Sequence, residues 1–217
     1  MNRVQIKICG ITKVEDAKAC TELGADMIGL NFYPQSSRYI QPQRARQIVE
    51  GIPRSIRAVG VFVDPAASEV RAIAKITGIE CVQLHGDVPP DTCRELAREF
   101  RVIRAFSTGS QFQPKDAAPF SECDVLLDAY HAGLRGGTGL TCDWPAARAT
   151  LPFTRFLILS GGLNAQNVGQ AIESVAPHAV DVCSGVESAP GAKDYRAIKN
   201  FVAAVRMAGR PVTASSP

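Results

Sequence analysis

Short apolar runs alternate with amphipathic stretches of helical length along most of this chain. The apolar runs are too brief for helices and are bounded by turn residues, so each of them predicts a buried strand. The predicted strands lie near residues 4–9, 27–33, 57–63, 81–86, 101–107, 125–130, 156–161 and 179–185. The amphipathic patterns predict helices near residues 13–23, 42–50, 66–76, 89–98, 143–150, 164–176 and 193–208.

This alternation predicts parallel strands joined by crossover helices. Eight such units in 217 residues point to one closed (β/α)8 barrel, a TIM barrel, spanning residues 1–208. Because residues 108–120 contain two prolines and a glycine, we expect the fifth helix to be short or replaced by a loop. The rival is an open doubly wound sheet, but no Gly-x-Gly-x-x-Gly follows the first strand. Residues 209–217 are mostly small and polar and predict a disordered tail.

The composition is that of an ordinary globular protein, with 46% hydrophobic and 21% charged residues. A net charge of +3 gives no basic stripe, which argues against a nucleic-acid partner. The first residues lack the apolar core of a signal peptide, and the apolar runs are too short to span a membrane. We therefore expect a cytoplasmic protein without a membrane partner.

The seven cysteines form an odd set with no paired metal-ligand spacing. In a reducing compartment most of them are expected to be small buried hydrophobes, so neither disulfides nor a zinc site is predicted. A cysteine that is exposed beside positive charge would be an exception, because its thiolate is reactive.

The first predicted strand carries a lysine and a cysteine on one face. Period-two alternation puts Lys7 and Cys9 opposite Ile6 and Ile8, with the first pair about 7 Å apart along the strand. In a TIM barrel the active site lies at the C-terminal ends of the strands, where Cys9 falls. A neighbouring ammonium lowers the pKa of a thiol, so Cys9 is a candidate base or nucleophile.

The sixth predicted strand ends in a carboxylate and passes into a glycine-rich loop. Asp128 must be desolvated or hydrogen-bonded there, and either effect shifts its pKa, so it is a candidate proton donor or acceptor. The loop Gly136-Gly137-Thr138-Gly139 lacks the Gly-Lys-Ser/Thr ending of a nucleotide P-loop. A lid that excludes water fits this loop better.

Three other polar side chains occur in or after predicted strands. Arg38 follows the second strand in a loop with aromatic residues, a suitable setting for binding a carboxylate. His85 ends the fourth strand, where a ligand contact and a purely structural hydrogen bond are equally expected. Arg104 interrupts the apolar fifth strand, and it points either to the barrel mouth or to a carboxylate in the core.

The loops after the last two strands predict a phosphate site. Gly161 and Gly162 follow the seventh strand, and Ser184 and Gly185 follow the eighth. TIM barrels often bind phosphate with these two loops, whose backbone amides converge on the anion.

With these positions assembled, the chain resembles phosphoribosylanthranilate isomerase of tryptophan biosynthesis from about residue 4 to residue 206. Six motifs occur in the order of that family. They are Lys7-Ile8-Cys9-Gly10-Ile11-Thr12, Ser37-Arg38-Tyr39-Ile40, Gln83-Leu84-His85-Gly86, Leu127-Asp128 followed by Gly136-Gly137-Thr138-Gly139, Ser160-Gly161-Gly162-Leu163 and Ser184-Gly185-Val186-Glu187. The chain departs from the family pattern at Cys183, where serine is usual.

The resemblance implies an Amadori rearrangement of N-(5-phosphoribosyl)anthranilate to 1-(2-carboxyphenylamino)-1-deoxyribulose 5-phosphate, without a cofactor or a metal. Carried over to this sequence, Cys9 is the general base and Asp128 the general acid. The phosphate is bound by the last two loops, and Arg38 binds the anthranilate carboxylate. The residues expected to bind the rest of the substrate are Lys7, His85 and Asp181.

Other functions remain open at this point. Another phosphosugar barrel, such as indole-glycerol-phosphate synthase or a pentose-phosphate epimerase, would need further acid–base groups or metal-ligating residues at several strand ends. Only His85 of the three histidines is well placed for that. A barrel that binds a phosphorylated ligand without catalysis is the alternative from another class. The related histidine-pathway isomerisation is a candidate side activity, and the chain could be a monomer or a homodimer.

Overall fold

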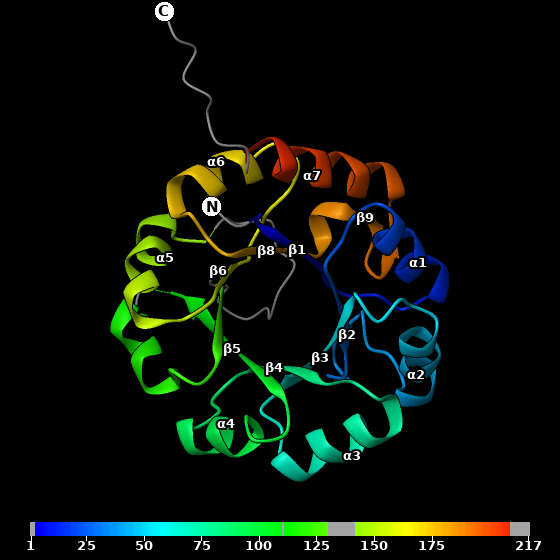
Figure 1. Ribbon diagram of the computed structural model, residues 1–217, viewed down its shortest axis with the longest axis horizontal. Coiled ribbons are helices and arrows are strands. Elements are labelled where there is room, and N and C mark those ends of the chain that lie inside the picture. The colour runs from blue at the N-terminus through cyan, green and yellow to red at the C-terminus, as the bar shows by residue number, and fades with distance from the viewer. Residues whose placement is uncertain (1–2, 110, 130–141, 209–217) are drawn as a thin grey trace, which may run out of the picture.

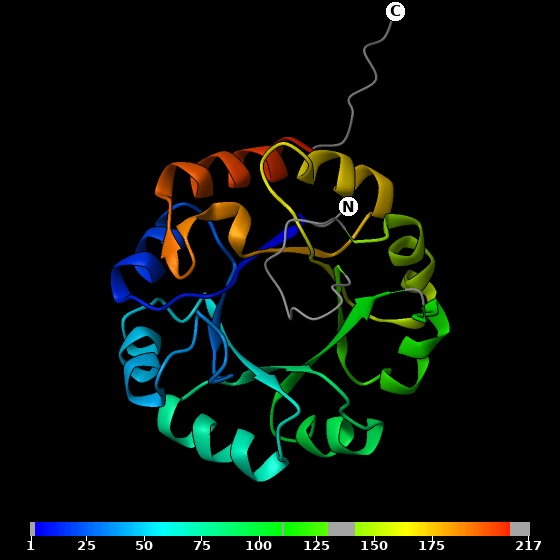
Figure 2. The same cartoon turned by 180° about the vertical axis from the view of Figure 1, so that it is seen from behind.

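The computed structural model describes residues 3–109, 111–129 and 142–208. Eight parallel strands close into a barrel inside a ring of helices (Figure 1, Figure 2). Neighbours in sequence are neighbours in the barrel, and β8 pairs back onto β1. The strands are β1 (Gln5–Ile8), β2 (Met27–Asn31), β3 (Arg57–Val63), β4 (Cys81–His85), β5 (Arg101–Thr108), β6 (Asp124–Ala129), β7 (Leu157–Leu159) and β8 (Ala179–Val182). This arrangement confirms the predicted TIM barrel.

The helices lie outside the strands and cover them. They are α1 (Val14–Glu22), α2 (Pro42–Glu50), α3 (Ala67–Thr77), α4 (Pro90–Leu96), α5 (Trp144–Thr150), α6 (Val168–Val175) and α7 (Tyr195–Ala208). A 3-10 helix, η1 (Pro114–Phe120), replaces the helix after β5, as its prolines led us to expect. Two further 3-10 turns are η2 (Leu151–Phe153) and η3 (Ser184–Val186).

The predicted element ends were wrong around the last strand. The eighth strand stops at Val182, and a small antiparallel hairpin of β9 (Glu187–Ala189) and β10 (Ala192–Lys193) follows η3. The last helix therefore begins at Tyr195 and not at Lys193. The predicted tail 209–217 and the predicted lid around Gly136-Gly137-Thr138-Gly139 lie outside the described residues.

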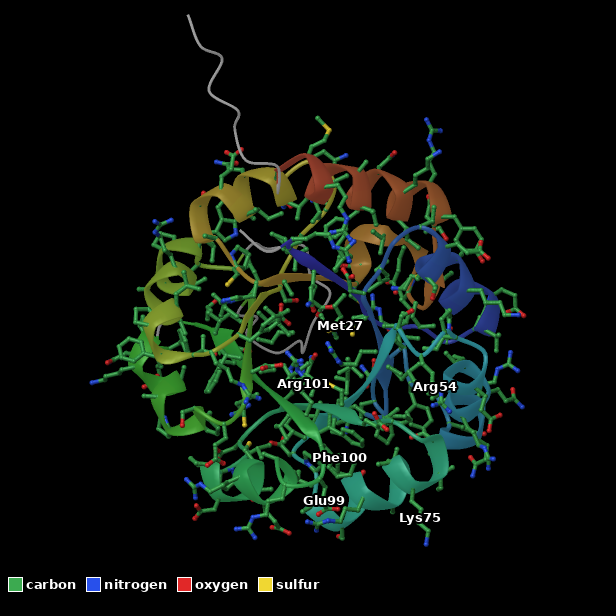
Figure 3. All side chains as sticks on the ribbon, viewed as in Figure 1. Met27, Arg54, Lys75, Glu99, Phe100 and Arg101 are labelled. Atoms are coloured by element: carbon green, nitrogen blue, oxygen red, sulfur yellow. The ribbon has the colours of Figure 1, made fainter. Side chains whose placement is uncertain are left out.

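Apolar side chains fill the part of the barrel interior that lies toward the N-terminal ends of the strands. They form a cluster of Met27, Val59, Cys81, Ile103, Ala105, Leu126, Ile158 and Ala179, and Figure 3 labels Met27 inside the ring of strands. Two residues further along a strand, the same face carries the next layer towards the C-terminal ends. That layer is polar, with Gln83 after Cys81, Asp128 after Leu126 and Asp181 after Ala179. The barrel interior is thus apolar toward the N-terminal ends of the strands and polar toward their C-terminal ends, where an active site is expected.

The position of Arg104 contradicts both expectations, since it points neither to the barrel mouth nor to a carboxylate in the core. Its neighbour Ala105 faces the barrel interior, so Arg104 points outward into the layer between strands and helices. The buried guanidinium donates to the carbonyls of Leu84 at 3.1 Å and Gly86 at 2.8 Å, and it lies 4.6 Å from the centre of the Phe106 ring. Arg104 therefore stabilises the outer wall of the barrel.

Among the described residues, no helix has the length and apolar character needed to cross a membrane.

Candidate active site

Cys9 lies directly after β1, at the C-terminal end of the barrel. Its amide donates to the carbonyl of Val182 at 2.8 Å, and its own carbonyl accepts a hydrogen bond from Lys193 Nζ at 2.6 Å. The thiol lies against β2 at Gly29, where a Cβ atom would come within 2.6 Å of Sγ. A glycine at position 29 therefore makes room for this cysteine, a requirement that the sequence pattern did not reveal.

A buried ion pair lies beneath this end of the barrel. Lys7 Nζ donates to Asp181 Oδ1 at 2.9 Å, and the Lys7 side chain is 0% exposed. The other oxygen, Asp181 Oδ2, accepts from Ser160 Oγ at 3.4 Å. Burial alone would lower the pKa of Lys7, but the charge of Asp181 and the nearby Cys9 outweigh burial and raise it. The barrel thus holds a permanent ammonium group next to Cys9.

Asp128 is the penultimate residue of β6 and is only partly exposed. Its Oδ1 accepts a hydrogen bond from the Ala129 amide at 2.9 Å. Burial, with a smaller contribution from the charge of Asp181, raises the pKa of Asp128 to about 6, against the opposing effects of the Ala129 amide, Lys7 and Ser160. A larger fraction of this carboxyl group is therefore protonated near neutral pH than for an ordinary aspartate.

The pKa of Cys9 is lowered by its surroundings, whereas that of Asp128 is raised. A hydrogen bond with Cys183 lowers the pKa of Cys9 more than burial raises it, and Lys7 and Lys193 lower it further, to about 7. The interaction with Cys9 and burial raise the pKa of Cys183, which therefore keeps its proton. Its Sγ donates to Glu187 Oε1 at 3.8 Å. Cys9 is therefore ionised to a substantial extent near neutral pH.

The structure brings four predicted site residues together. Lys7 and Asp181 affect the pKa of both Cys9 and Asp128, so one ion pair is shared by the two titrating groups. Since all eight strands are parallel, the ends of β1 and β6 lie at the same end of the barrel. The arrangement is suited to moving protons on a small molecule held at this end.

Arg38 lies in the loop after β2 and contacts a glutamate 149 positions away. Its Nε donates to Glu187 Oε1 at 3.0 Å, and its Nη2 donates to Glu187 Oε2 at 2.6 Å. Glu187 Oε1 also accepts from Lys193 Nζ at 2.8 Å. Glu187 and Lys193 were missed by the sequence reasoning. The Ser-Gly-Val-Glu motif contains Glu187, but no pattern along the chain indicated its partners.

The two predicted phosphate loops pack against each other. A Cβ atom on Gly185 would lie 2.1 Å from the carbonyl oxygen of Leu163, so the loops after β7 and β8 touch at this glycine. Gly161 has φ +87°, and a Cβ there would lie 2.4 Å from the amide nitrogen of Ala129, next to Asp128. Gly162 and Ser184 lie in these same loops, so the predicted phosphate site adjoins the carboxyl group.

His85 lies apart from this cluster. It ends β4, three strands from β1 in the order of the barrel, and its ring nitrogen is 2.5 Å from the amide nitrogen of Gln83. The imidazole is partly exposed at the same C-terminal end. The structure therefore places His85 on the opposite side of the barrel mouth from Cys9.

A groove of about 960 Å³ lies at the other end of the barrel, between α2 and α3. Figure 3 labels Arg54 and Lys75 in this region. Its lining comes from the segments that precede β3 and β4, and it contains none of the predicted site residues. This groove is therefore separate from the predicted site residues at the C-terminal ends of the strands.

Taken together, the fold and the site define a TIM-barrel enzyme with a candidate acid–base pair at the C-terminal ends of its strands. The model of the N-(5′-phosphoribosyl)anthranilate (PRA) isomerase family matches residues 6–204. The chain belongs to this family.

Individual members of the family are similar over nearly their whole length. The N-(5′-phosphoribosyl)anthranilate isomerase of Thermotoga petrophila is 43% identical over 199 residues, which cover 92% of this chain and 97% of that protein. The crystal structure of phosphoribosyl anthranilate isomerase from Thermotoga maritima has a TM-score of 0.88 at 41% identity, covering 94% of this chain and 99% of that one. A phosphoribosyl anthranilate isomerase in complex with reduced 1-(o-carboxyphenylamino)-1-deoxyribulose 5-phosphate has a TM-score of 0.83 at 40% identity, with the same coverage.

Proposed function

We propose that this chain converts N-(5-phosphoribosyl)anthranilate to 1-(2-carboxyphenylamino)-1-deoxyribulose 5-phosphate, with Cys9 as general base and Asp128 as general acid. The observation that carries the proposal is the ion pair Lys7–Asp181, which is shared by the thiol and the carboxyl group at one end of the barrel. Membership of the isomerase family supplies the substrate.

The rearrangement needs one proton delivered and one removed. Asp128 donates a proton to the ring oxygen of the furanose, which opens the ring and leaves a protonated Schiff base. Cys9 then removes the proton from C2′, and the resulting enolamine tautomerises to the ketone. The iminium of the substrate accepts the electron pair, so the substrate itself supplies the electron sink for this step.

The environments of the two groups suit these roles. Burial makes the protonated form of Asp128 available near neutral pH, with a pKa of about 6. The Cys183 thiol and the Lys7 ammonium stabilise the thiolate of Cys9, with a pKa of about 7. Both groups can therefore be in their reactive forms in the same pH range.

Binding groups surround this pair. Glu187 holds Arg38 in a fixed orientation, and Arg38 Nη1 makes a contact of 3.4 Å with Ser37 Oγ. We assign this nitrogen to the anthranilate carboxylate. The touching loops at Gly161 and Gly185 bind the phosphate through backbone amides. His85, across the barrel mouth, binds the side of the substrate away from Cys9.

The small phosphorylated substrate is the partner that this proposal requires. As an enzyme of amino-acid biosynthesis, the chain would act in the cytoplasm, where such intermediates are made and used. The oligomeric state, monomer or homodimer, does not enter the mechanism, since every group named above comes from one chain.

The test is a fluorescence assay that follows consumption of the anthranilate-ring substrate by the purified protein. C9A and D128N are each expected to lower kcat by ~10²–10⁴-fold, the usual value of a general acid–base step. D91N is the matched control, because Asp91 is 91% exposed on α4, and it is expected to keep full activity. Calorimetric binding of the reduced product analogue should persist in both site variants. Near wild-type kcat in C9A or D128N would contradict the assigned roles, and an inactive wild type would favour the non-catalytic alternative.

A further inference from the structure

Cys9 and Cys183 occupy opposite positions where the barrel closes. Strands β1 and β8 are in register, with Ile8 beside Val182. The residue that follows each of these two is one of the cysteines. Neighbouring strands lie about 4.8 Å apart. A disulfide joins Cα atoms that are about 4.4–6.8 Å apart, so the backbones are within the range that an S–S bond requires.

The two cysteines are also held together through their backbones. Lys193 Nζ donates to the carbonyl of Cys9 at 2.6 Å and to that of Cys183 at 3.4 Å. The two thiols are close enough for each to shift the pKa of the other, and Cys183 Sγ donates to Glu187 Oε1 at 3.8 Å. Cys183 Sγ lies 3.0 Å from the place that a Cβ on Gly10 would take, directly beside Cys9.

Accessibility separates this pair from the other cysteines. All seven cysteines lie in the described part of the chain, and only Cys9 and Cys183 are partly exposed while five are buried. A second pair, Cys93 and Cys123, is also close enough for each thiol to shift the pKa of the other, but each of these residues is 1% exposed. Thiolate character and exposure together determine which cysteines react with oxidants. Cys9 meets both conditions, and its neighbour Cys183 is also partly exposed, so the buried pair serves as an internal comparison.

We propose that Cys9 and Cys183 form a reversible disulfide when the protein meets a peroxide. The thiolate of Cys9 attacks one peroxide oxygen, the O–O bond breaks, and Cys9 becomes a sulfenic acid while hydroxide leaves. The sulfur of Cys183 then attacks the Cys9 sulfur, the S–O bond breaks, and the released hydroxide takes the Cys183 proton to form water. The hydroxide from the first step takes up the proton that Cys9 released when it ionised. In total two thiols lose two electrons, and hydrogen peroxide is reduced to two molecules of water.

The disulfide has two effects: it protects Cys9 from further oxidation and it inactivates the site. It prevents further oxidation of Cys9 to sulfinic acid, which is not reversed by ordinary thiols. It also removes the thiolate on which the proton abstraction depends. This loss of activity rests on the proposed function of Cys9, whereas formation of the bond does not.

Mass spectrometry of the whole purified protein tests the bond directly. After brief peroxide treatment, alkylation and trypsin digestion, peptides 8–13 and 156–193 are expected as one species, lighter by two hydrogens than their sum. Dithiothreitol should separate them, and the peptides that carry Cys93 and Cys123 should stay alkylated. Sulfinic acid on Cys9 with an alkylated Cys183 in the wild type would overturn the proposal.

C183S is the matched variant, because serine keeps a hydrogen-bond donor of similar size beside Cys9 and cannot form the bond. Each protein is compared with its own untreated sample. Peroxide exposure is continued until mass spectrometry shows sulfinic acid on Cys9 of C183S, because a sulfenic acid alone is also reduced by dithiothreitol. Under the same exposure, wild-type activity is expected to fall at least about tenfold and to return with dithiothreitol, whereas the activity of C183S should not return. Recovery in both proteins would overturn the proposal. A wild-type disulfide with unchanged activity would uphold the bond and contradict the catalytic role of Cys9.

Discussion

At the scale of single residues, the site depends on two groups whose pKa values are moved toward each other. Burial raises the pKa of Asp128 to about 6, and the Cys183 hydrogen bond lowers that of Cys9 to about 7. The proposed general acid therefore has the lower pKa of the two, and both groups titrate over a narrow interval around neutrality.

The pH profile of kcat/KM is expected to be bell-shaped and narrow. In the proposed mechanism, activity needs the Cys9 thiolate and the protonated Asp128, so it falls when the pH drops below both pKa values and when it rises above both. Because the acid has the lower pKa, only about a tenth of the singly protonated enzyme carries the proton on Asp128. The profile should peak near pH 6.5, with limbs near 6 and 7. A flat rate between pH 5 and 8 would contradict this arrangement.

D128N is expected to stabilise the protein while it lowers kcat by ~10²–10⁴-fold. The folded-state pKa of Asp128, about 6, lies above the ordinary value of 3.8, so the folded state binds the proton more tightly than the unfolded chain. The ionised carboxyl group therefore destabilises the fold above pH 6, and this cost disappears below about pH 4. We expect urea unfolding at pH 8 to show a gain of about 1–3 kcal/mol for the variant. An equal gain at pH 3.5 would show that ionisation is not the cause.

Residue-level prediction from the sequence worked where it used strand periodicity. Alternation correctly placed Lys7 on the inner face of the barrel, because side-chain direction in a strand depends only on position. The same rule was not applied to Arg104, whose neighbour Ala105 marks it as outward-facing. The link from Arg38 to Glu187 could not be predicted, because it joins residues 149 positions apart.

At the scale of elements, the loops after β7 and β8 and the β9–β10 hairpin form one structural unit. Gly185 packs on the carbonyl of Leu163, and the hairpin delivers Lys193 to the carbonyls of Cys9 and Cys183. The sequence predicted the two loops from their glycines, but not the hairpin. Strands of two and three residues are too short for any periodic pattern to show.

G185A is expected to weaken substrate binding more than catalysis. The added methyl group would lie 2.1 Å from the Leu163 oxygen and must push apart the two loops that are proposed to bind phosphate. We predict a rise in KM of at least about tenfold, as a displaced anion contact of about 1.4 kcal/mol would give. Steady-state kinetics and calorimetry with the reduced product analogue measure the effect. The control is G169A in α6, where the nearest atom is 4.0 Å away and alanine favours the helix. Equal KM values for wild type and G185A would contradict phosphate binding here.

At the scale of the whole molecule, the barrel closes through β1 and β8, and the buried pair Lys7–Asp181 spans this seam. The repeated strand–helix pattern was sufficient to predict the closed barrel. It could not show that an ion pair lies across the seam, since the two residues are 174 positions apart.

D181N is expected to destabilise the fold, because it leaves the Lys7 ammonium buried without its counter-charge. Loss of one partner of a buried pair costs about 3–5 kcal/mol, whereas replacing both partners with apolar residues is often neutral. The double variant K7M/D181L should therefore recover most of the stability in urea unfolding and remain inactive. A double variant as unstable as D181N would contradict this explanation, because it would show that the loss of stability does not come from the unpaired charge of Lys7.

Because the sheet is closed, the position of the chain termini along the sequence matters less than the arrangement of the elements in space. Arg206 in α7 donates to the carbonyl of Val4, just before β1, at 2.7 Å, so the two extremes of the described fold already touch. Circular permutation exploits such contacts. A gene that links this helix to that strand and starts translation between α2 and β3, at the pole away from the thiol and the carboxyl group, would encode the same ring.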